Sequence, residues 1–122
     1  MLFLQLTKSN KMNIEELREF CISLPDVTEG FPFDETTLVF KVNGKMFLLT
    51  DLEGPLSINV KCDPEKAEEL RLSYPGVVKP GYHMHKKLWN TVEIDGSITD
   101  KLIYQWITDS YDLVKQKNKR KS

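Results

Sequence analysis

The stretch that decides the fold is residues 36–51, TTLVFKVNGKMFLLTD. Two runs of β-branched and large apolar residues flank Asn43-Gly44, and this dipeptide between such runs is the strongest short-range signal for a β-hairpin with a two-residue turn. The turn sets the register, and the core-facing pairs expected from it are Phe40/Phe47 and Leu38/Leu49. The expected pairs on the other face are Val39/Leu48 and Lys41/Met46. Because this second face is only half apolar, we expect it to be partly covered or open to a partner.

A third strand and a helix are predicted directly after the hairpin. Residues 56–61, LSINVK, alternate between apolar and polar side chains, which favours a strand that continues the hairpin as an antiparallel meander. Asp63 followed by Pro64 is a favourable helix start, and Tyr74-Pro75-Gly76 ends this helix. Val77 and Val78 then predict a very short strand.

The residues before the hairpin predict a helix and a loop. Asn13 and Glu16 have the spacing of a capping box, and apolar residues recur at helical intervals over residues 14–23. Pro25 ends this helix. Residues 26–35 are rich in turn formers and have no period, so we expect a loop that enters a short strand.

At the other end of the chain, Ser97 or Thr99 is expected to cap a last helix that runs to about Val114. The basic residues Lys115, Lys117, Lys119, Arg120 and Lys121 follow it. Removing these five from the 17 basic residues leaves 12 against 18 acidic residues, so residues 1–114 are acidic overall. An acidic body is a poor surface for general nucleic-acid binding, which therefore needs a local basic patch or the tail.

Length and composition indicate one soluble globular domain. The chain has 122 residues, of which 40% are hydrophobic and 29% are charged, which is typical of a folded domain with its own core. Cys21 and Cys62 lie far apart without metal-ligand spacing and are expected to be free thiols in a reducing cytoplasm. No run approaches the length of a membrane span, and residues 1–11 lack the features of an export signal. We expect a cytoplasmic monomer with an extension (1–11), one domain (12–114) and a basic tail (115–122).

The segment 79–92, KPGYHMHKKLWNTV, is the candidate binding site. It holds both histidines, two adjacent lysines and one of the two tryptophans, and it has no acidic residue. A loop followed by a strand from Leu88 is expected here, with alternate side chains on opposite faces. The candidate site residues are Lys79, His83, His85, Lys86, Lys87, Trp89, Asn90 and Thr91.

Two interpretations of this segment stay open. Trp89 among cations and histidines can stack on a base or ring while Lys87 meets a phosphate or carboxylate. Alternatively, Trp89 turns into the core and the His-Lys run is a loop with its charges in water. His83 and His85 point the same way on a strand, but Glu93 is the sole nearby third ligand, so no metal site is expected.

Common catalytic motifs are absent from the sequence. There is no P-loop, no Rossmann glycine pattern, no GxSxG and no HExxH. We therefore expect a protein that is not an enzyme and has no cofactor.

The order of several blocks resembles the MmcQ/YjbR family. The blocks are LPDVTEGFPF, VFKVNGKMF, INVKCDPEKAEELR, GYHMHKKLWNTV, a DGS turn and SYDLV, and together they span residues 12 to about 114. The resemblance implies a CyaY-like α+β fold, with an antiparallel sheet of about five strands packed against helices in the order α-β-β-β-α-β-α. It also implies a proposed double-wing mode of DNA binding. His83, Lys86, Trp89, Asn90 and Thr91 match the family motif, whereas His85 and Leu88 stand where the family commonly has Asn and His.

Two functions of different classes follow from these observations. In the first, the protein is a DNA-binding module in which Lys79, Lys86 and Lys87 contact phosphates and Trp89 and Asn90 meet bases or sugars. In the second, the sheet face and the 82–91 segment form a scaffold for an anionic small molecule or a protein partner. A third and weaker possibility, cation binding by analogy with frataxin, has only the acidic residues of helix 14–23 as candidates.

Overall fold

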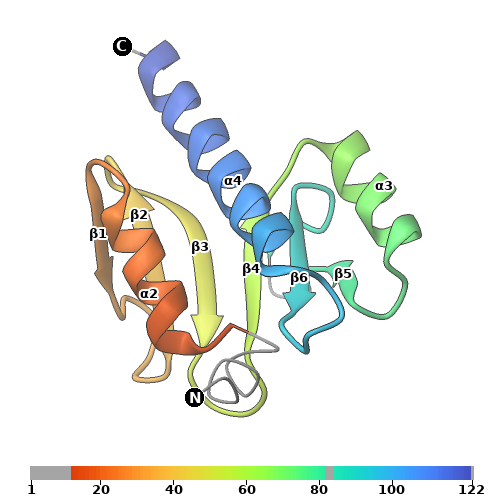
Figure 1. Ribbon diagram of the computed structural model, residues 1–122. Coiled ribbons are helices and arrows are strands. Elements are labelled where there is room, and N and C mark those ends of the chain that lie inside the picture. Colours follow the sequence, from red (N-terminus) through yellow and green to blue (C-terminus); the bar gives the residue numbers. More distant parts are fainter. Residues whose placement is uncertain (1–11, 82–83, 122) are drawn as a thin grey trace.

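The structure is a computed structural model that describes residues 12–81 and 84–121, with the side chains of 12–81 and 84–116. The elements in chain order are α2 (Ile14–Ser23), β1 (Val27–Gly30), β2 (Thr37–Val42), β3 (Lys45–Asp51), β4 (Ser57–Lys61), α3 (Pro64–Ser73), β5 (Val78–Pro80), β6 (Trp89–Glu93) and α4 (Asp100–Lys121). The strands form one antiparallel sheet in the order β1-β2-β3-β4-β6-β5 (Figure 1). The predicted α+β class and the antiparallel meander are confirmed, with six strands among the described residues where about five were expected.

The three helices formed by the described residues pack on one face of the sheet. α4 lies across β2, β3 and β4, α2 lies beside β1, and α3 lies beside β5 and β6 (Figure 1). The main core fills the space between helices and sheet, and its largest fully buried side chains include Phe40, Phe47, Leu17, Ile103 and Ile107. None of the described residues forms a helix on the opposite face of the sheet, and we call it the open face.

The predicted hairpin forms, with Asn43 and Gly44 at φ 53° and 83°, as a two-residue turn of this kind requires. Its register shifts at a β-bulge between Phe40 and Lys41. The observed pairs are Val42/Lys45, Lys41/Met46, Phe40/Leu48 and Val39/Leu49. The expected Lys41/Met46 pair is therefore confirmed, while Phe40/Phe47, Leu38/Leu49 and Val39/Leu48 are wrong.

The bulge changes which side chains reach the core. It lets the consecutive residues Phe47 and Leu48 both enter the main core and turns Leu49 to the open face. A strict two-residue alternation cannot predict this, because one extra residue in β3 breaks the period.

The helix boundaries follow the predicted signals except at the C-terminal end. The capping box is present, because the Glu16 amide donates to Asn13 Oδ1 (2.8 Å) and the Asn13 amide donates to Glu16 Oε1 (3.1 Å). The Leu102 amide donates to Thr99 Oγ1 (3.3 Å), so Thr99 is the cap of α4. α4 continues to Lys121 instead of ending at about Val114, so most of the basic tail is helical. Lysines near a helix C-terminus interact favourably with the helix dipole, and neither Gly nor Pro interrupts these turns.

The two ends of the sheet, the hairpin end and the loop end, differ in their connections. The hairpin end contains the turn at 43–44, the end of β4 at Lys61 and the start of β6 at Trp89. The loop end contains the connections 31–36 and 52–56, which lie together because the Leu52 amide donates to the Thr36 carbonyl (2.8 Å). The last turns of α4 extend past the hairpin end (Figure 1).

Buried hydroxyl groups attach α4 to the hairpin end. The Ser110 hydroxyl donates to the Phe47 carbonyl (2.6 Å) and accepts from the Lys61 amide (2.8 Å). The Tyr111 hydroxyl donates to the Pro25 carbonyl (2.6 Å). Among the described residues, no helix has the length and apolar character needed to cross a membrane.

Candidate functional site

The structure separates the predicted site residues into buried and exposed groups. His83 lies outside the described residues. Asn90 and Trp89 are buried, Lys79 and Thr91 are half-buried, and His85, Lys86 and Lys87 are exposed. The alternation predicted for the strand is present, since Trp89 and Asn90 face opposite sides of the sheet.

Asn90 connects the sheet to α3. Its side chain is fully buried, where Oδ1 accepts a hydrogen bond from Arg71 Nε (2.7 Å) and Nδ2 donates to the Ala67 carbonyl (3.2 Å). Arg71 also donates to the Lys86 carbonyl, so the same network holds the turn before β6. The polar atoms of Asn90 are thus used inside the protein, and its main contribution is to position the exposed turn.

Trp89 is buried away from the main core. Its side chain is 6% exposed and packs on the open face with Val39 and Leu49, with Met84 and Leu88 packed against this small cluster. Lys61 Nζ lies 6.0 Å from the centroid of the indole ring. Trp89 forms the floor of the open face and presents little ring surface to a ligand.

The backbone of Trp89 also explains a glycine in the segment. The Gly81 amide donates to the Trp89 carbonyl (2.9 Å), and a Cβ at position 81 would lie 3.0 Å from the Trp89 Cβ. Only glycine allows this close approach without a shift. Gly81 therefore fixes the spacing between β5 and the start of β6.

Two further residues of the predicted site have partners within the sheet. Lys79 Nζ lies 3.1 Å from Glu93 Oε2 in a half-exposed ion pair. The Thr91 hydroxyl donates to Asn59 Oδ1 (2.6 Å) on the open face. These contacts leave the turn at residues 85–87 as the exposed part of the predicted site.

The fold gathers cations at the hairpin end that are far apart in sequence. Lys45 lies beside the hairpin turn, and the register places Lys61 next to Trp89 and the turn that carries Lys87. The cations of this end are Lys41, Lys45, Lys61, Lys86 and Lys87. The helical basic stretch of α4 begins at the same end, where Lys115 Nζ lies 3.8 Å from Asp26 Oδ2.

The loop end carries the opposite charge. Its acidic residues are Asp34, Glu35, Asp51, Glu53, Asp95 and Asp100. The hairpin end has carboxylates too: Asp26 and Asp63 lie there, and Asp109 and Asp112 line the groove beside Lys61, but cations outnumber them among the described residues. The formal net charge of -1 therefore hides a separation of charge along the sheet.

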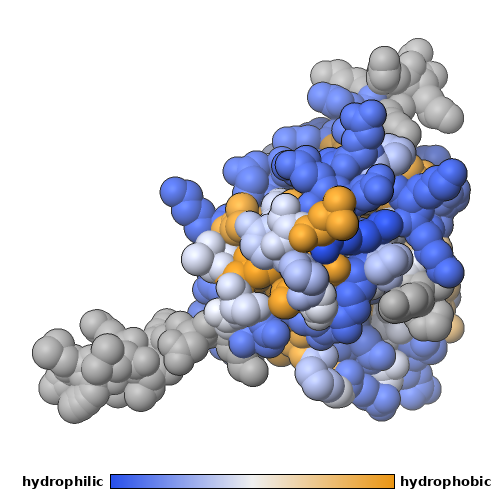
Figure 2. All heavy atoms as spheres, turned by 90° about the vertical axis from the view of Figure 1, so that its right-hand side faces the viewer, coloured by the Kyte–Doolittle hydropathy of each residue, from blue (hydrophilic) through white to orange (hydrophobic). Residues whose placement is uncertain are grey.

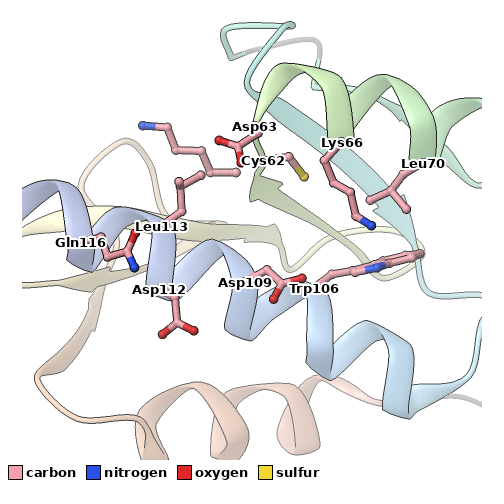
Figure 3. A pocket seen from close by; sticks show the side chains of 10 residues that line it. Cys62, Asp63, Lys66, Leu70, Trp106, Asp109, Asp112, Leu113 and Gln116 are labelled. Carbon is pink, nitrogen blue, oxygen red and sulfur yellow. The ribbon is translucent and has the colours of Figure 1, made fainter.

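A groove of about 350 Å³ lies between α3 and α4, next to the hairpin end (Figure 3). Trp106 and Leu70 form apolar walls, and the Lys66 side chain extends from α3 toward Trp106 and Asp109 on α4 (Figure 3). Cys62 lines the groove as well, and burial raises the pKa of its thiol to about 11. The thiol is therefore protonated near neutral pH and is a poor nucleophile.

A second pocket, of about 470 Å³, lies on the open face toward the loop end. Leu49, Met84 and Phe33 supply apolar surface, and Asp34 and Asp51 supply carboxylates. Thr37, Thr50 and Asn59 complete the lining. We call it the open-face pocket.

Neither pocket was predicted from the sequence. Cys62 and Lys66 lie far from Trp106 in the chain, and no local pattern relates the loop at Phe33 to Met84. The expected free thiols are confirmed for Cys21 and Cys62. Among the described residues, no three His, Cys, Asp or Glu side chains are grouped so that they could hold a metal ion.

Curated relatives match most of the chain. It is 40% identical to the uncharacterized protein YbdF of Escherichia coli O157:H7 over 101 residues, which cover 82% of each protein. It is 33% identical to the uncharacterized protein YjbR of Escherichia coli K12, over 82% of this chain and 85% of that protein.

Solved structures and a family model agree with these relatives. The crystal structure of Deinococcus radiodurans protein DR2400, of domain family DUF419, aligns with a TM-score of 0.85 and 41% identity over 91% of this chain and 84% of that one. A crystal structure from Pseudomonas syringae aligns with a TM-score of 0.73 and 28% identity over 84% of this chain and 99% of that one. Because the YjbR family model matches residues 22–113 as well, this chain belongs to the YjbR family.

Proposed function

We propose that this YjbR-family protein binds DNA by contacting duplex phosphates with the cations of its hairpin end. The observation that supports this proposal is the separation of charge along the sheet. Lysines from three separate segments converge on one end, although the described body of the chain is acidic overall. Phosphate contacts supply most of the affinity of nonspecific DNA binding, so a local basic surface is the first requirement.

The shape of the hairpin end suits two contacts with a duplex. The turn at 43–44 and the turn at 85–88 project from the same end of the sheet, and Lys61 lies between them. These two turns are the natural counterparts of the two wings that the family resemblance implies. The last turns of α4, with further lysines, pass the same end (Figure 1).

The burial of Asn90 and Trp89 limits how such a protein reads sequence. The Asn90 amide is bonded to Arg71 and Ala67, and the Trp89 ring is covered on the open face. Phosphate contacts position a protein on DNA, whereas contacts with base edges specify the sequence. We therefore expect binding with strong salt dependence and little sequence preference.

The side of the molecule with α3 and β5 offers no large competing surface. Figure 2 shows this side as mainly hydrophilic, with hydrophobic residues grouped near its centre and a few at its margins. Large apolar patches mark protein interfaces, and a confined group of this kind does not require one. The charged hairpin end is the more distinctive surface.

Fluorescence anisotropy with a generic labelled duplex tests the proposal. Wild type is titrated at about 50 mM and about 200 mM salt beside a Lys45→Ala, Lys87→Ala variant, which removes one cation from each turn. Lys101→Ala is the matched control, because Lys101 is also exposed but lies at the start of α4, near the loop end. The Lys86 side chain is left in place, since the backbone of that residue accepts from Arg71.

The variant is expected to lose about tenfold in affinity and to show a shallower salt dependence, by about one unit of log-log slope per lost phosphate contact. Lys101→Ala should bind like wild type. A chain shortened by residues 117–122 separates the fold from the tail. If only the full chain binds and the two-lysine variant equals wild type, the hairpin end is not the DNA-binding surface.

A further inference from the structure

The open-face pocket has the dimensions of a ligand site. Its volume of about 470 Å³ falls within the roughly 300–1,000 Å³ that is usual for small-molecule sites. It lies between the loop before β2, which supplies Phe33, and Met84, with Leu49 at the floor. It faces away from α2, α3 and α4 and lies toward the loop end, although Met84 in its wall directly precedes the turn at 85–88.

Apolar side chains are unusually exposed around this pocket. Phe33 is 62% exposed, and its neighbours Phe31 and Leu52 are 49% and 44% exposed. The Leu52 amide bonds to the Thr36 carbonyl, so these exposed side chains lie on two adjoining loops. Exposed large apolar groups gathered beside a pocket indicate a binding surface more than isolated ones do.

Two of the five polar residues that line the pocket, Asp34 and Asp51, are carboxylates, and no lysine or arginine lines it. Asp34 is held in place by the amides of Thr36 (3.0 Å) and Thr37 (2.7 Å), and these bonds lower the pKa of its carboxyl group. Asp51 Oδ1 accepts from the Glu53 amide (2.9 Å). Within residues 12–81 and 84–116, neither carboxylate forms an ion pair with a lysine or arginine.

These features define the ligand by its chemistry. We infer that the open-face pocket binds a small organic cation that carries an ammonium group on an apolar or aromatic body. The ammonium group pairs with Asp51 and Asp34 at the rim, and the apolar body covers Leu49, Met84 and Phe33. The two carboxylates disfavour the anionic metabolite that the sequence suggested for this face.

The inference does not depend on DNA binding, because the pocket and the hairpin end use different residues. A ligand at the pocket contacts none of Lys45, Lys61 or Lys87. Failure of one proposal therefore leaves the other intact, and the two assays can be run on the same protein samples.

Three probes of similar shape separate charge from apolar contact. Phenethylamine is cationic, phenethyl alcohol is neutral and hydrocinnamate is anionic, while all three carry a phenyl ring on a short chain. Each is titrated into protein labelled at the methionine methyl groups, and NMR shifts of the Met84 and Met46 signals are followed. Phenethylamine is expected to shift the Met84 signal and to bind about tenfold more tightly than the alcohol, and hydrocinnamate more weakly still.

Variants test the assignment of the charge. Asp51→Asn should weaken phenethylamine about threefold to fivefold and leave the alcohol unchanged. Asp112→Asn, on α4 by the other groove, is the matched control and should bind like wild type. Equal binding of all three probes, or an Asp51→Asn variant that binds phenethylamine like wild type, overturns the inference. The same holds if phenethylamine shifts the Trp106 indole signal and leaves Met84 unmoved.

Discussion

The hairpin end and the loop end belong to one sheet, yet they have opposite character. At the hairpin end, short turns carry lysines above a buried network of Arg71, Asn90 and Ala67. At the loop end, longer connections carry carboxylates and exposed phenylalanines beside an open pocket. The first end is tightly bonded beneath a charged surface, and the second has apolar surface without a partner among the described residues.

This difference shows why net charge is a poor guide to function here. A formal charge of -1 suggests a nearly neutral molecule, but the lysines are concentrated at the hairpin end and most carboxylates of the sheet connections lie at the loop end. The Debye length in physiological salt is about 8 Å, so each end acts on its surroundings almost independently. The four predictions below test the contrast, beginning with the largest effect.

Removing Asn90 should loosen the hairpin end. Asn90→Ala removes the buried hydrogen bonds to the Ala67 carbonyl and from Arg71 Nε and leaves a small cavity, so we expect a loss of about 3 kcal/mol in unfolding free energy. Urea denaturation measures the loss, and hydrogen exchange should rise around residues 85–89 but not at the loop end. The matched variant is Thr91→Ala, which removes one half-exposed hydrogen bond and should cost about 1 kcal/mol. Similar losses for both would contradict the role assigned to Asn90.

The alkylation rate of Cys62 tests whether the cations of the hairpin end lower the pKa of a nearby thiol. Burial and the nearby Asp109 and Asp63 raise its pKa to about 11, against the opposing effect of Arg71 and Lys66. Each pKa unit changes the thiolate fraction tenfold, so alkylation at neutral pH should be about a hundredfold slower in the folded protein than in urea. The rate should climb with pH up to about 11. Fast alkylation at neutral pH would show that the cations outweigh burial.

Charge changes at the two ends should affect DNA binding unequally. Lys87→Glu makes the net charge more negative by two and should weaken binding about tenfold, because it acts at the contact. Asp51→Lys makes the net charge more positive by two at the loop end, and should strengthen binding less than about threefold at physiological salt. Anisotropy titrations of both variants measure the effects. Equal and opposite changes would mean that net charge, and not the hairpin end, controls binding.

The smallest effect is expected for the ion pair between the two ends. Lys79 and Glu93 are half-exposed, with side-chain exposures of 38% and 29%, so Lys79→Ala should change the unfolding free energy by less than about 1 kcal/mol. DNA affinity should fall less than in a Lys87→Ala variant, since Glu93 already neutralises Lys79. Thermal denaturation at low and high salt checks the first statement. A large loss in either measurement would mean that Lys79 acts together with the cations of the hairpin end.

Local signals in the sequence predicted most of the elements. The Asn43-Gly44 turn, the Asn13/Glu16 box and the Asp63-Pro64 start act within a few residues, so their outcome does not depend on the rest of the chain. The bulge that brings Phe47 and Leu48 into the core was not predictable, because it adds one residue to β3 and breaks the two-residue period on which the expected pairing rests.

The candidate site was harder to predict than the fold. Composition found the segment 79–92, but it could not show that Asn90 would face α3 or that Trp89 would be covered by Met84 and Leu88. The group of cations at the hairpin end forms because the strand register brings Lys45, Lys61 and Lys87 together. Such sites are products of topology, and a single sequence does not contain them as a contiguous pattern.

The strand order also affects how prone the protein is to aggregate through its edge strands. An exposed edge strand is a template on which another chain can add, and long flat edges lead to polymers. Here the edges are β1, with four residues, and β5, with three, and β5 ends in Pro80, which has no amide hydrogen to donate. The central hydrophobic strands β2, β3 and β4 are paired on both sides. A sheet with such short edges can present an uncovered face at high concentration without growing into a fibril.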